Sequence, residues 1–402
     1  MDRVDRYADL IVRVGADVQP GQTVFVLALP EHAELARAIT RSAYDAGATY
    51  VDVLYGDPHV RRAMIERASD ETLTYSPSWI VERNRVAADG GAFIMIAGEN
   101  EPELLADLDQ TRVGKARMLD AIAEVRRGQN EKTMAWTIAA WPTAGWAQLM
   151  FGEPDVERLW DAISASVGLD EEDPVAAWKA HGDKLRARCK QLNDLKFDAL
   201  HYEGPGTDLT VGLLPEHRWL GGGVETTYGA FHIANMPTEE CFTVPDRNRA
   251  DGTVRSTYPL QLGGTIVRDL EFTLADGKIV DVQASTGAET MRSLLATDDS
   301  APRLGEVALV DGSSRVGKTG LVFFNTLFDE NATCHIAFGS AIQASTDGSL
   351  DDLDADGKQA RGFNISAVHT DFMVGGPDVT VTGIAKDGTK TTIIEGDVWQ
   401  LS

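Results

Sequence analysis

The chain has 402 residues, of which 43% are hydrophobic and 25% charged, so it matches folded globular proteins and not disordered chains. This length is enough for two domains that each bury a core. An excess of 62 acidic over 37 basic residues gives a formal charge of −25. That charge repels phosphate backbones and anionic lipid, so we expect no nucleic-acid and no membrane partner.

The first part of the chain alternates between predicted helices and strands. Helical patterns cover residues 2–15, 31–47, 102–128 and 155–195, and short apolar runs predict strands at 23–29, 49–54, 92–98 and 133–141. A βαβ rhythm of this kind is typical of a parallel sheet covered by helices. We therefore expect an α/β amino-terminal domain with a parallel sheet over residues 1–195.

The pattern changes near Leu195 to strands and tight turns. Asp276-Gly277 and Asp387-Gly388 each lie between alternating apolar runs, which predicts two β-hairpins. We therefore expect an α+β, strand-rich carboxyl-terminal catalytic domain over residues 196–402. It contains every candidate metal ligand described below.

The sequence favours a cytoplasmic location. Its amino terminus lacks the uninterrupted apolar core of a secretory signal, and no run of about 18 apolar residues could span a membrane. Cys189, Cys241 and Cys334 are odd in number and not spaced as CxxC, which is typical of reduced thiols. Asn331 and Asn364 begin glycosylation sequons, which have no meaning without export.

Two histidines and an aspartate near the carboxyl end suggest a metal site. His335 lies between the apolar runs LVFF and IAFG, so its ring is expected to point inward. His369 and Asp371 are two residues apart, and on a strand this spacing puts both side chains on one face. Imidazoles with a carboxylate suit zinc, cobalt, manganese or ferrous iron. A single buried histidine is more often just hydrogen-bonded in the core, but two histidines and an aspartate together favour a metal.

Further carboxylates lie in apolar surroundings upstream. Glu239 and Glu240 directly precede Cys241, and Glu306 begins the apolar run EVALV. Burying an unpaired carboxylate costs on the order of several kcal/mol. A shared metal is one partner that would remove this cost.

Several long segments resemble one known family. In order and spacing, NMPTEE, LGEVALV, GLVFFNTLFDENA, HIAFG and HTDFM resemble the motifs of the metallo-aminopeptidases that include aminopeptidases T, S and PepS, the thermophilic metalloprotease type. PGQTVFV, VDVLYGD, DPVAAWKAH and GPGTDLTVGL extend the likeness over nearly the whole chain. The resemblance implies a homodimeric, two-metal-dependent aminopeptidase that hydrolyses the amino-terminal residue of peptides through a metal-bound hydroxide. It places the ligands of two divalent ions (zinc, cobalt or manganese) at Glu240, Glu306, His335, His369 and Asp371.

The charges agree with two ions. Glu240, Glu306 and Asp371 supply three negative charges against four positive ones, and one hydroxide completes neutrality, as suits a two-metal hydrolase. Glu239 or Glu330 could accept the proton of the attacking water, because both adjoin ligand segments. The alternative for each is a carboxylate that only supports or surrounds the site.

One position departs from the family pattern. The family has a catalytic tyrosine seven residues after the first ligand histidine, whereas this chain reads HIAFGSAI and has Ile342 there. Loss of one donor to a tetrahedral intermediate typically costs about a hundredfold to a thousandfold in rate. Either another phenol such as Tyr228 or Tyr258 replaces it, or the site performs different chemistry.

Two other functions remain open from the sequence. His335, His369 and Asp371 also form a two-histidine, one-carboxylate set, as in mononuclear iron oxygenases, and a ring-cleaving dihydroxypyridine dioxygenase is similar in fold to these aminopeptidases. A single iron would leave Glu240 and Glu306 unneutralised. The second alternative is a non-catalytic binding protein that keeps the scaffold and has lost activity. If the site is that of a metallohydrolase, its substrate could also be another small molecule.

Two further features need a structural check. Residues 312–319 match the phosphate-loop pattern GxxxxGK[ST], but that loop must open a helix, and we predict that TGLVFFN after it forms a strand. His232, eight residues before Glu240, is a candidate support or substrate contact.

Overall fold

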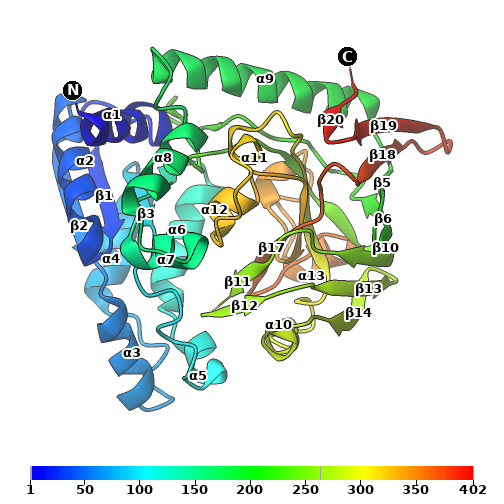
Figure 1. Ribbon diagram of the computed structural model, residues 1–402, viewed down its shortest axis with the longest axis horizontal. Helices are drawn as coiled ribbons and strands as arrows, with labels where there is room; N and C mark the ends of the chain where they lie inside the picture. The colour runs from blue at the N-terminus through cyan, green and yellow to red at the C-terminus, as the bar shows by residue number, and fades with distance from the viewer. Residues whose placement is uncertain (1, 263, 402) are drawn as a thin grey trace. The chain divides into compact units, whose positions relative to one another are not determined.

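The computed structural model describes residues 2–262 and 264–401 (Figure 1). The chain divides into two compact units, which are unit 1, Met1–His181 with Gly223–Thr238, and unit 2, Gly182–Gly222 with Glu239–Ser402. The boundary expected between residues 195 and 196 falls inside unit 2, at the end of helix α9 (Pro174–Leu195). The division of the chain at that boundary stays a prediction.

Unit 1 contains the predicted parallel sheet. Its strand order is β2-β1-β3-β4, and the strands are β2 (Tyr50–Tyr55), β1 (Thr23–Ala28), β3 (Ala92–Ala97) and β4 (Ala135–Ala140). All three pairings are parallel. On the central strand β1, Val24 and Val26 on one face and Phe25 on the other are all buried, because helices cover both faces.

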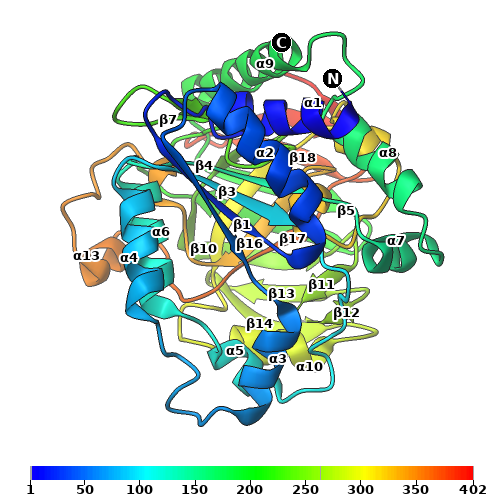
Figure 2. The same cartoon turned by 90° about the vertical axis from the view of Figure 1, so that its left-hand side faces the viewer.

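The helices of unit 1 divide between the two faces of the sheet. They are α1 (Arg3–Leu10), α2 (Ala33–Asp45), α3 (Pro58–Arg67), α4 (Ser78–Ala88), α5 (Gln110–Lys115), α6 (Leu119–Asn130), α7 (Ala144–Phe151) and α8 (Val156–Ser166), with a π-helical turn at Ile11–Gly15. The connection from β1 to β2 and the connection from β2 to β3 run in opposite directions along the sheet, so right-handed crossovers place α2 and α4 on opposite faces. Phe25 and Phe93 form the core under α4 with Ala87. Figure 2 shows α4 beside α6, and α1 beside α2.

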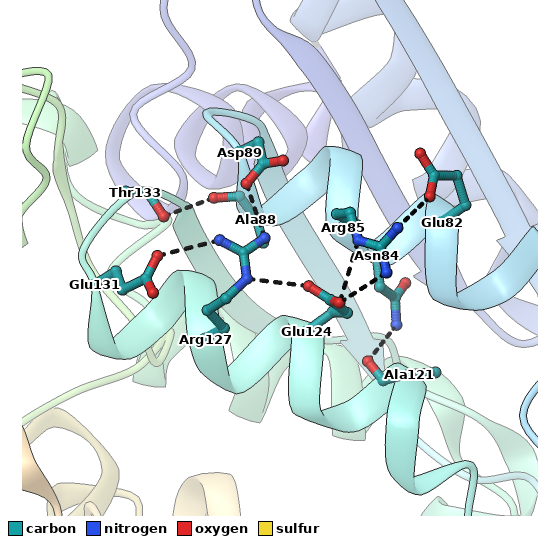
Figure 3. A network of polar contacts seen from close by, with 10 residues as sticks. All are labelled: Glu82, Asn84, Arg85, Ala88, Asp89, Ala121, Glu124, Arg127, Glu131 and Thr133. Carbon is teal, nitrogen blue, oxygen red and sulfur yellow. Dashed lines mark hydrogen bonds and ion pairs between the residues drawn. The ribbon is translucent and has the colours of Figure 1, made fainter. Parts of the chain in front are cut away.

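A polar network joins α4 to α6 (Figure 3). Arg127 donates to Asp89 at 2.8 Å and to Glu124 at 3.0 Å, and Arg85 also donates to Glu124. Below these exposed pairs, the buried Asn84 Nδ2 donates to the Ala121 carbonyl at 2.9 Å. Exposed ion pairs contribute little to stability, so the buried amide is the stronger link.

Unit 2 is built on two antiparallel sheets. The larger has the order β14-β13-β10-β6-β5-β18-β19-β20, with β14 (Lys278–Gln283), β13 (Glu271–Ala275), β10 (Pro245–Arg255), β6 (Thr207–Leu213), β5 (Ala199–Gly204), β18 (Thr380–Ile384), β19 (Lys390–Glu395) and β20 (Val398–Trp399). The smaller has the order β17-β16-β15-β9, with β17 (His369–Met373), β16 (His335–Gly339), β15 (Leu304–Leu309) and β9 (Cys241–Thr243). Both predicted Asp-Gly hairpins are present, as β13–β14 and β18–β19. Phe272 of the larger sheet packs edge-on against Phe338 and Phe372 of the smaller one, which joins the two sheets in one core.

The remaining elements of unit 2 are short. They are α10 (Ala288–Leu295), α11 (Arg315–Lys318), α12 (Thr326–Asp329), α13 (Ala355–Ala360), the 3₁₀ turn Gln343–Ser345 and the hairpin β11 (Leu260–Leu262) with β12 (Thr265–Val267). In Figure 1, α10 lies beside β14. Unit 1 also contains the small hairpin β7 (Val224–Glu225) and β8 (Phe231–His232) and the 3₁₀ turn Pro30–His32.

The strand predicted over TGLVFFN is wrong. Residues 319–325 form a loop, and the backbone N–H groups of Phe323 and Asn325 donate to the Asp329 carboxylate at 2.7 and 3.0 Å. Phe323 also stacks on Phe328 with ring centroids 4.6 Å apart. A side chain therefore satisfies this apolar backbone without a partner strand. The helix within the phosphate-loop pattern, α11, has only four residues.

The helical stretch expected over residues 102–128 is only partly helical. Residues 102–107 form turns, and α5 and α6 are separate helices. The apolar residues of this stretch pack in a satellite cluster with α3, where Val113 meets Ile65 and Leu73. Among the described residues, no helix is both long and apolar enough to cross a membrane.

Candidate metal centre

The small sheet of unit 2 brings four of the five predicted ligands onto one face. Ala337 in β16 is paired with Glu306 in β15 on one side and with Asp371 in β17 on the other. Residues directly opposite each other in antiparallel strands point to the same face. His335 and His369 share that face, because each lies two residues along its strand from a member of this row. The same-face placement predicted for His369 and Asp371 is therefore present.

Two glycines shape the strand ends beside these side chains. The register between β15 and β16 shifts between Leu304 and Glu306, so Gly305 occupies a bulge that turns Glu306 toward the other ligands. A Cβ on Gly305 would lie 2.4 Å from the Gly339 carbonyl oxygen, so only glycine fits. Gly339 has φ of +97°, and a Cβ there would lie 2.3 Å from the Val368 carbonyl oxygen.

The candidate ligand atoms form two groups that share Glu306. In the first, His335 Nε2 lies 3.0 Å from Glu240 Oε2 and 3.9 Å from Glu306 Oε1. In the second, His369 Nε2 lies 3.3 Å from Glu306 Oε2 and 3.5 Å from Asp371 Oδ1. The ligand atoms within each group all lie within 4.8 Å of one another. Each group therefore pairs one imidazole with two carboxylates.

The two groups differ in exposure. His335, Glu240 and Glu306 are buried, whereas the His369 side chain is 29% exposed. The Nδ1–H of His369 donates to the Ser340 carbonyl at 2.7 Å, and its Nε2 faces the carboxylates of Glu306 and Asp371. The Nδ1 of His335 is buried and has no hydrogen-bond partner among the described residues.

The site concentrates negative charge in a buried place. Burial lowers the pKa of His335, but the hydrogen bond and charge of Glu240, with the charges of Asp371 and Glu330, outweigh it and raise that pKa to about 10. Burial raises the pKa of Glu306, and the Glu240 charge adds to this against the hydrogen bond from His369. Burial also opposes the charge on Asp371, but His369 outweighs it and lowers the pKa of Asp371.

The structure separates the two carboxylates considered as bases. Burial raises the pKa of Glu330 well above its usual value, the charges of Asp371 and Glu240 add to this, and Glu330 Oε1 lies 3.4 Å from Asn331 Nδ2. Glu239 Oε1 instead accepts from the Arg315 N–H at 2.9 Å. Burial raises the pKa of Glu239 to about 7, and the other charges acting on it are those of Arg315, Lys184 and Asp311. Glu239 thus directly precedes the candidate ligand Glu240 in the sequence, but its carboxylate binds the Arg315 backbone.

Ile342 and the two alternative phenols, Tyr228 and Tyr258, lie in different surroundings. Ile342 is half-buried two residues after Ser340, just before the 3₁₀ turn Gln343–Ser345. The Tyr228 hydroxyl, in unit 1, accepts from the Ala135 N–H at 3.0 Å. Burial raises the pKa of Tyr258, followed by the charges of Asp329 and Asp397, neither of which is a candidate ligand.

His232 belongs to unit 1, whereas the predicted ligands belong to unit 2. Its ring is buried, and its centroid lies 6.2 Å from that of the Trp136 ring. Both ring nitrogens lack a hydrogen-bond partner among the described residues, and burial lowers the pKa of His232 to about 4. It is therefore a neutral core side chain here.

Three residues around the site have no signal in the sequence that identifies them. Asn331 Oδ1 accepts from the Glu239 N–H at 2.7 Å, and its Nδ2 lies 3.4 Å from Glu330 Oε1. The Ser340 carbonyl orients His369, and the buried Asn364 side chain binds the adjacent Gly339 carbonyl. Asn331 and Asn364 are fully buried, so neither sequon asparagine is accessible to modification.

The side chains present fit divalent cations. Glu240, Glu306 and Glu330 are buried, as is the His335 imidazole, and a buried carboxylate requires a positive partner. Oxygen and imidazole nitrogen donors in this ratio suit zinc, cobalt or manganese. The sharing of Glu306 between the groups would let one carboxylate contact two neighbouring ions.

Known proteins share both the sequence and the fold. Residues 1–399 match the thermophilic metalloprotease (M29) family. Aminopeptidase T of Thermus thermophilus is 40% identical over 403 residues, which cover 98% of each chain. The solved structure of wild-type AmpT from Thermus thermophilus has a TM-score of 0.90 to this chain at 38% identity, with 99% of each chain covered.

A more distant structure is 2,5-dihydroxypyridine dioxygenase from Pseudomonas putida. It covers 100% of this chain and 99% of its own, with a TM-score of 0.56 and 12% identity. That similarity shows a shared fold alone.

Proposed function

The chain belongs to the thermophilic metalloprotease (M29) family, and we propose that it is a two-metal aminopeptidase that releases the amino-terminal residue of peptides or small amides. The observation that carries this proposal is the position of Glu306, which lies within both groups of candidate ligands. Each group has its own histidine and its own second carboxylate. This arrangement suits two neighbouring cations better than one.

The residues have separable roles in the proposed reaction. Glu240 and His335 would hold one ion and His369 and Asp371 the other, with Glu306 between them. When bound, such ions lower the pKa of a water molecule and polarise a carbonyl group. The first group is buried, which excludes bulk water, while the exposed side of His369 leaves an approach for substrate.

Glu330 is the better candidate for the general base. It is buried among the ligands, and the charges that act on it belong to Asp371, Glu240 and His335. A carboxylate in this place can accept the proton of the attacking water and hold it for the leaving amine. Glu239 would support the site through its contacts with Arg315 and Asn331.

A mononuclear iron dioxygenase is the second candidate function. His335, His369 and Asp371 are all present for it, and the fold is compatible. Against it, a single iron would leave one of the two buried groups of carboxylates without a cation. The metal content distinguishes these functions, since the aminopeptidase requires two ions per chain and the dioxygenase one iron.

The aminopeptidase proposal is tested with the native chain and an Ile342→Tyr variant. Amino-acyl anilides and dipeptides are the substrates, with zinc, cobalt or manganese added. We expect weak hydrolysis by the native chain and a rise of about tenfold, or about 1.4 kcal/mol of barrier, in Ile342→Tyr. We expect only a modest gain, because a larger side chain placed at a half-buried position must displace its neighbours. If neither protein cleaves any substrate while each binds two ions, a different small-molecule substrate becomes the leading hypothesis.

We also propose a homodimer formed through unit 1. β2 is an edge strand that pairs only with β1, and its tyrosines Tyr50 and Tyr55 are 58% and 42% exposed. Such an edge can pair with the same strand of a second copy about a twofold axis.

Sedimentation should give twice the 43.5 kDa chain mass for the native protein. Tyr50→Glu should dissociate it, while Trp79→Glu, on α4, should not. A native monomer at micromolar concentration contradicts the proposal.

The proposed location is the cytoplasm. All three cysteines are free and buried, as expected where thiols stay reduced.

A further inference from the structure

One hydrogen bond to the backbone holds the Nδ1 side of the His369 ring. This histidine is the most exposed of the candidate ligands, so packing restrains its ring less than that of His335. Its Nδ1–H donates to the Ser340 carbonyl at 2.7 Å. Outer hydrogen bonds of this kind fix the tautomer and ring orientation of metal-binding histidines. The position of the Ser340 carbonyl therefore decides where His369 Nε2 points.

Ser340 lies where the chain leaves β16, and this exit is unusually constrained. The Ser340 N–H donates to the Val368 carbonyl at 2.7 Å, and the Gly339 N–H donates to the Arg303 carbonyl at 2.7 Å. The positive φ of Gly339 turns the chain so that the next carbonyl faces His369. The turn needs support from outside the strand, because glycine alone does not hold one conformation.

Asn364 supplies that support on both sides of Ser340. Its side chain is fully buried, and its Nδ2 donates to the Gly339 carbonyl at 2.6 Å and to the Ser300 carbonyl at 3.0 Å, with the Arg303 carbonyl at 3.3 Å. Its own backbone carbonyl accepts from the Ala341 N–H at 2.8 Å. One residue thus holds the peptide groups directly before and after Ser340.

We propose that Asn364 is a positioning residue for His369. By fixing Gly339 and Ala341 it fixes the Ser340 carbonyl, and that carbonyl holds the His369 ring with Nε2 toward Glu306 and Asp371. The inference rests on the proposed function in one respect, which is that His369 binds a metal ion. It predicts a selective effect, because His335 Nδ1 has no hydrogen-bond partner within residues 2–262 and 264–401, and His335 belongs to the other group of ligands.

The test measures metal affinity and not activity. The full chain is loaded with zinc, dialysed against increasing concentrations of a competing chelator, and analysed for zinc per chain. We expect Asn364→Ala to lose one ion at a chelator level where the native chain keeps two. Loss of an outer-shell partner typically weakens metal binding by about 10-fold to 100-fold, so the competition curve of that one ion should shift by such a factor.

Asn193→Ala is the matched control. Asn193 is also an asparagine of unit 2 that clamps backbone, since its Nδ2 donates to the Trp219 carbonyl at 3.0 Å and its Oδ1 accepts from the Trp219 N–H at 2.9 Å. The Asn193→Ala variant should unfold at a lower temperature than the native chain when both are metal-free, and its zinc competition curve should be unchanged. If Asn364→Ala does not fold, the same chelator competition is measured on Asn364→Ser, which keeps one hydrogen-bond donor. We expect this variant too to lose one of its two zinc ions more readily than the native chain does.

The outcomes separate this inference from the proposed function. If the Asn364 variant binds both zinc ions as tightly as the native chain does, the positioning role is overturned. Equal weakening of both ions would also overturn it, because that result indicates general loss of structure. A native chain that binds no divalent ion would instead contradict the proposed function itself.

Discussion

Replacing Glu306 with alanine should remove both metal ions and reduce hydrolysis to the background level. Glu306 Oε1 lies 3.9 Å from His335 Nε2, and Oε2 lies 3.3 Å from His369 Nε2, so the carboxylate faces both histidines. Its loss deprives each proposed ion of one of two carboxylates. Two neighbouring cations would also repel each other more strongly without the negative charge of Glu306 between them. We therefore expect a larger loss of metal from this variant than from any single change in one group.

Elemental analysis after gel filtration measures this effect. Glu306→Ala should contain close to no zinc or cobalt, and His369→Ala should keep one ion per chain, because the buried group of His335 and Glu240 remains intact. Glu216→Ala is the control, since Glu216 is a buried carboxylate of unit 2 that pairs with Arg361 outside this group of ligands. Two ions retained in Glu306→Ala would show that Glu306 is not a ligand.

The parts of the site that follow strand periodicity could be predicted from the sequence. His369 and Asp371 are two residues apart, and that spacing alone places them on one face of β17. The inward position of His335 follows from the apolar residues on both sides of it. The parallel sheet of unit 1 was predictable for the same reason, because its strands are buried apolar runs separated by amphipathic helices.

The parts that depend on tertiary contacts could not be predicted. The bulge at Gly305 is set by the approach of the Gly339 carbonyl, which is distant in sequence. The buried loop at Phe323 has the composition of a strand, and only the Asp329 carboxylate that binds its N–H group makes a loop possible. Glu239 and Glu330 are equivalent by sequence, and their different partners appear only in the fold.

Glu330→Gln should lower kcat by about a hundredfold to ten-thousandfold while both ions stay bound, which is the usual contribution of a general base. Glutamine has nearly the same size as glutamate and can keep the contact with Asn331, but it cannot accept the proton of a water molecule. Glu239→Gln is the matched control, because it removes an adjacent buried carboxylate whose oxygen is bound to the Arg315 N–H. We expect it to retain most of the activity.

The pH profile gives the sharper distinction between a base and a ligand. Burial and the neighbouring carboxylates raise the pKa of Glu330, and below its pKa the protonated carboxyl can no longer accept a proton. Bound cations would offset part of this rise. The kcat of the native chain should therefore fall as the pH drops through that pKa, and the residual activity of Glu330→Gln should lack this acidic limb. If Glu330→Gln instead loses an ion, Glu330 is a ligand, and the proton must be accepted by another group. If it keeps both ions, the full rate and the acidic limb, Glu330 has no part in the proton transfer, and its burial beside Asp371 serves only to hold the ligands in place.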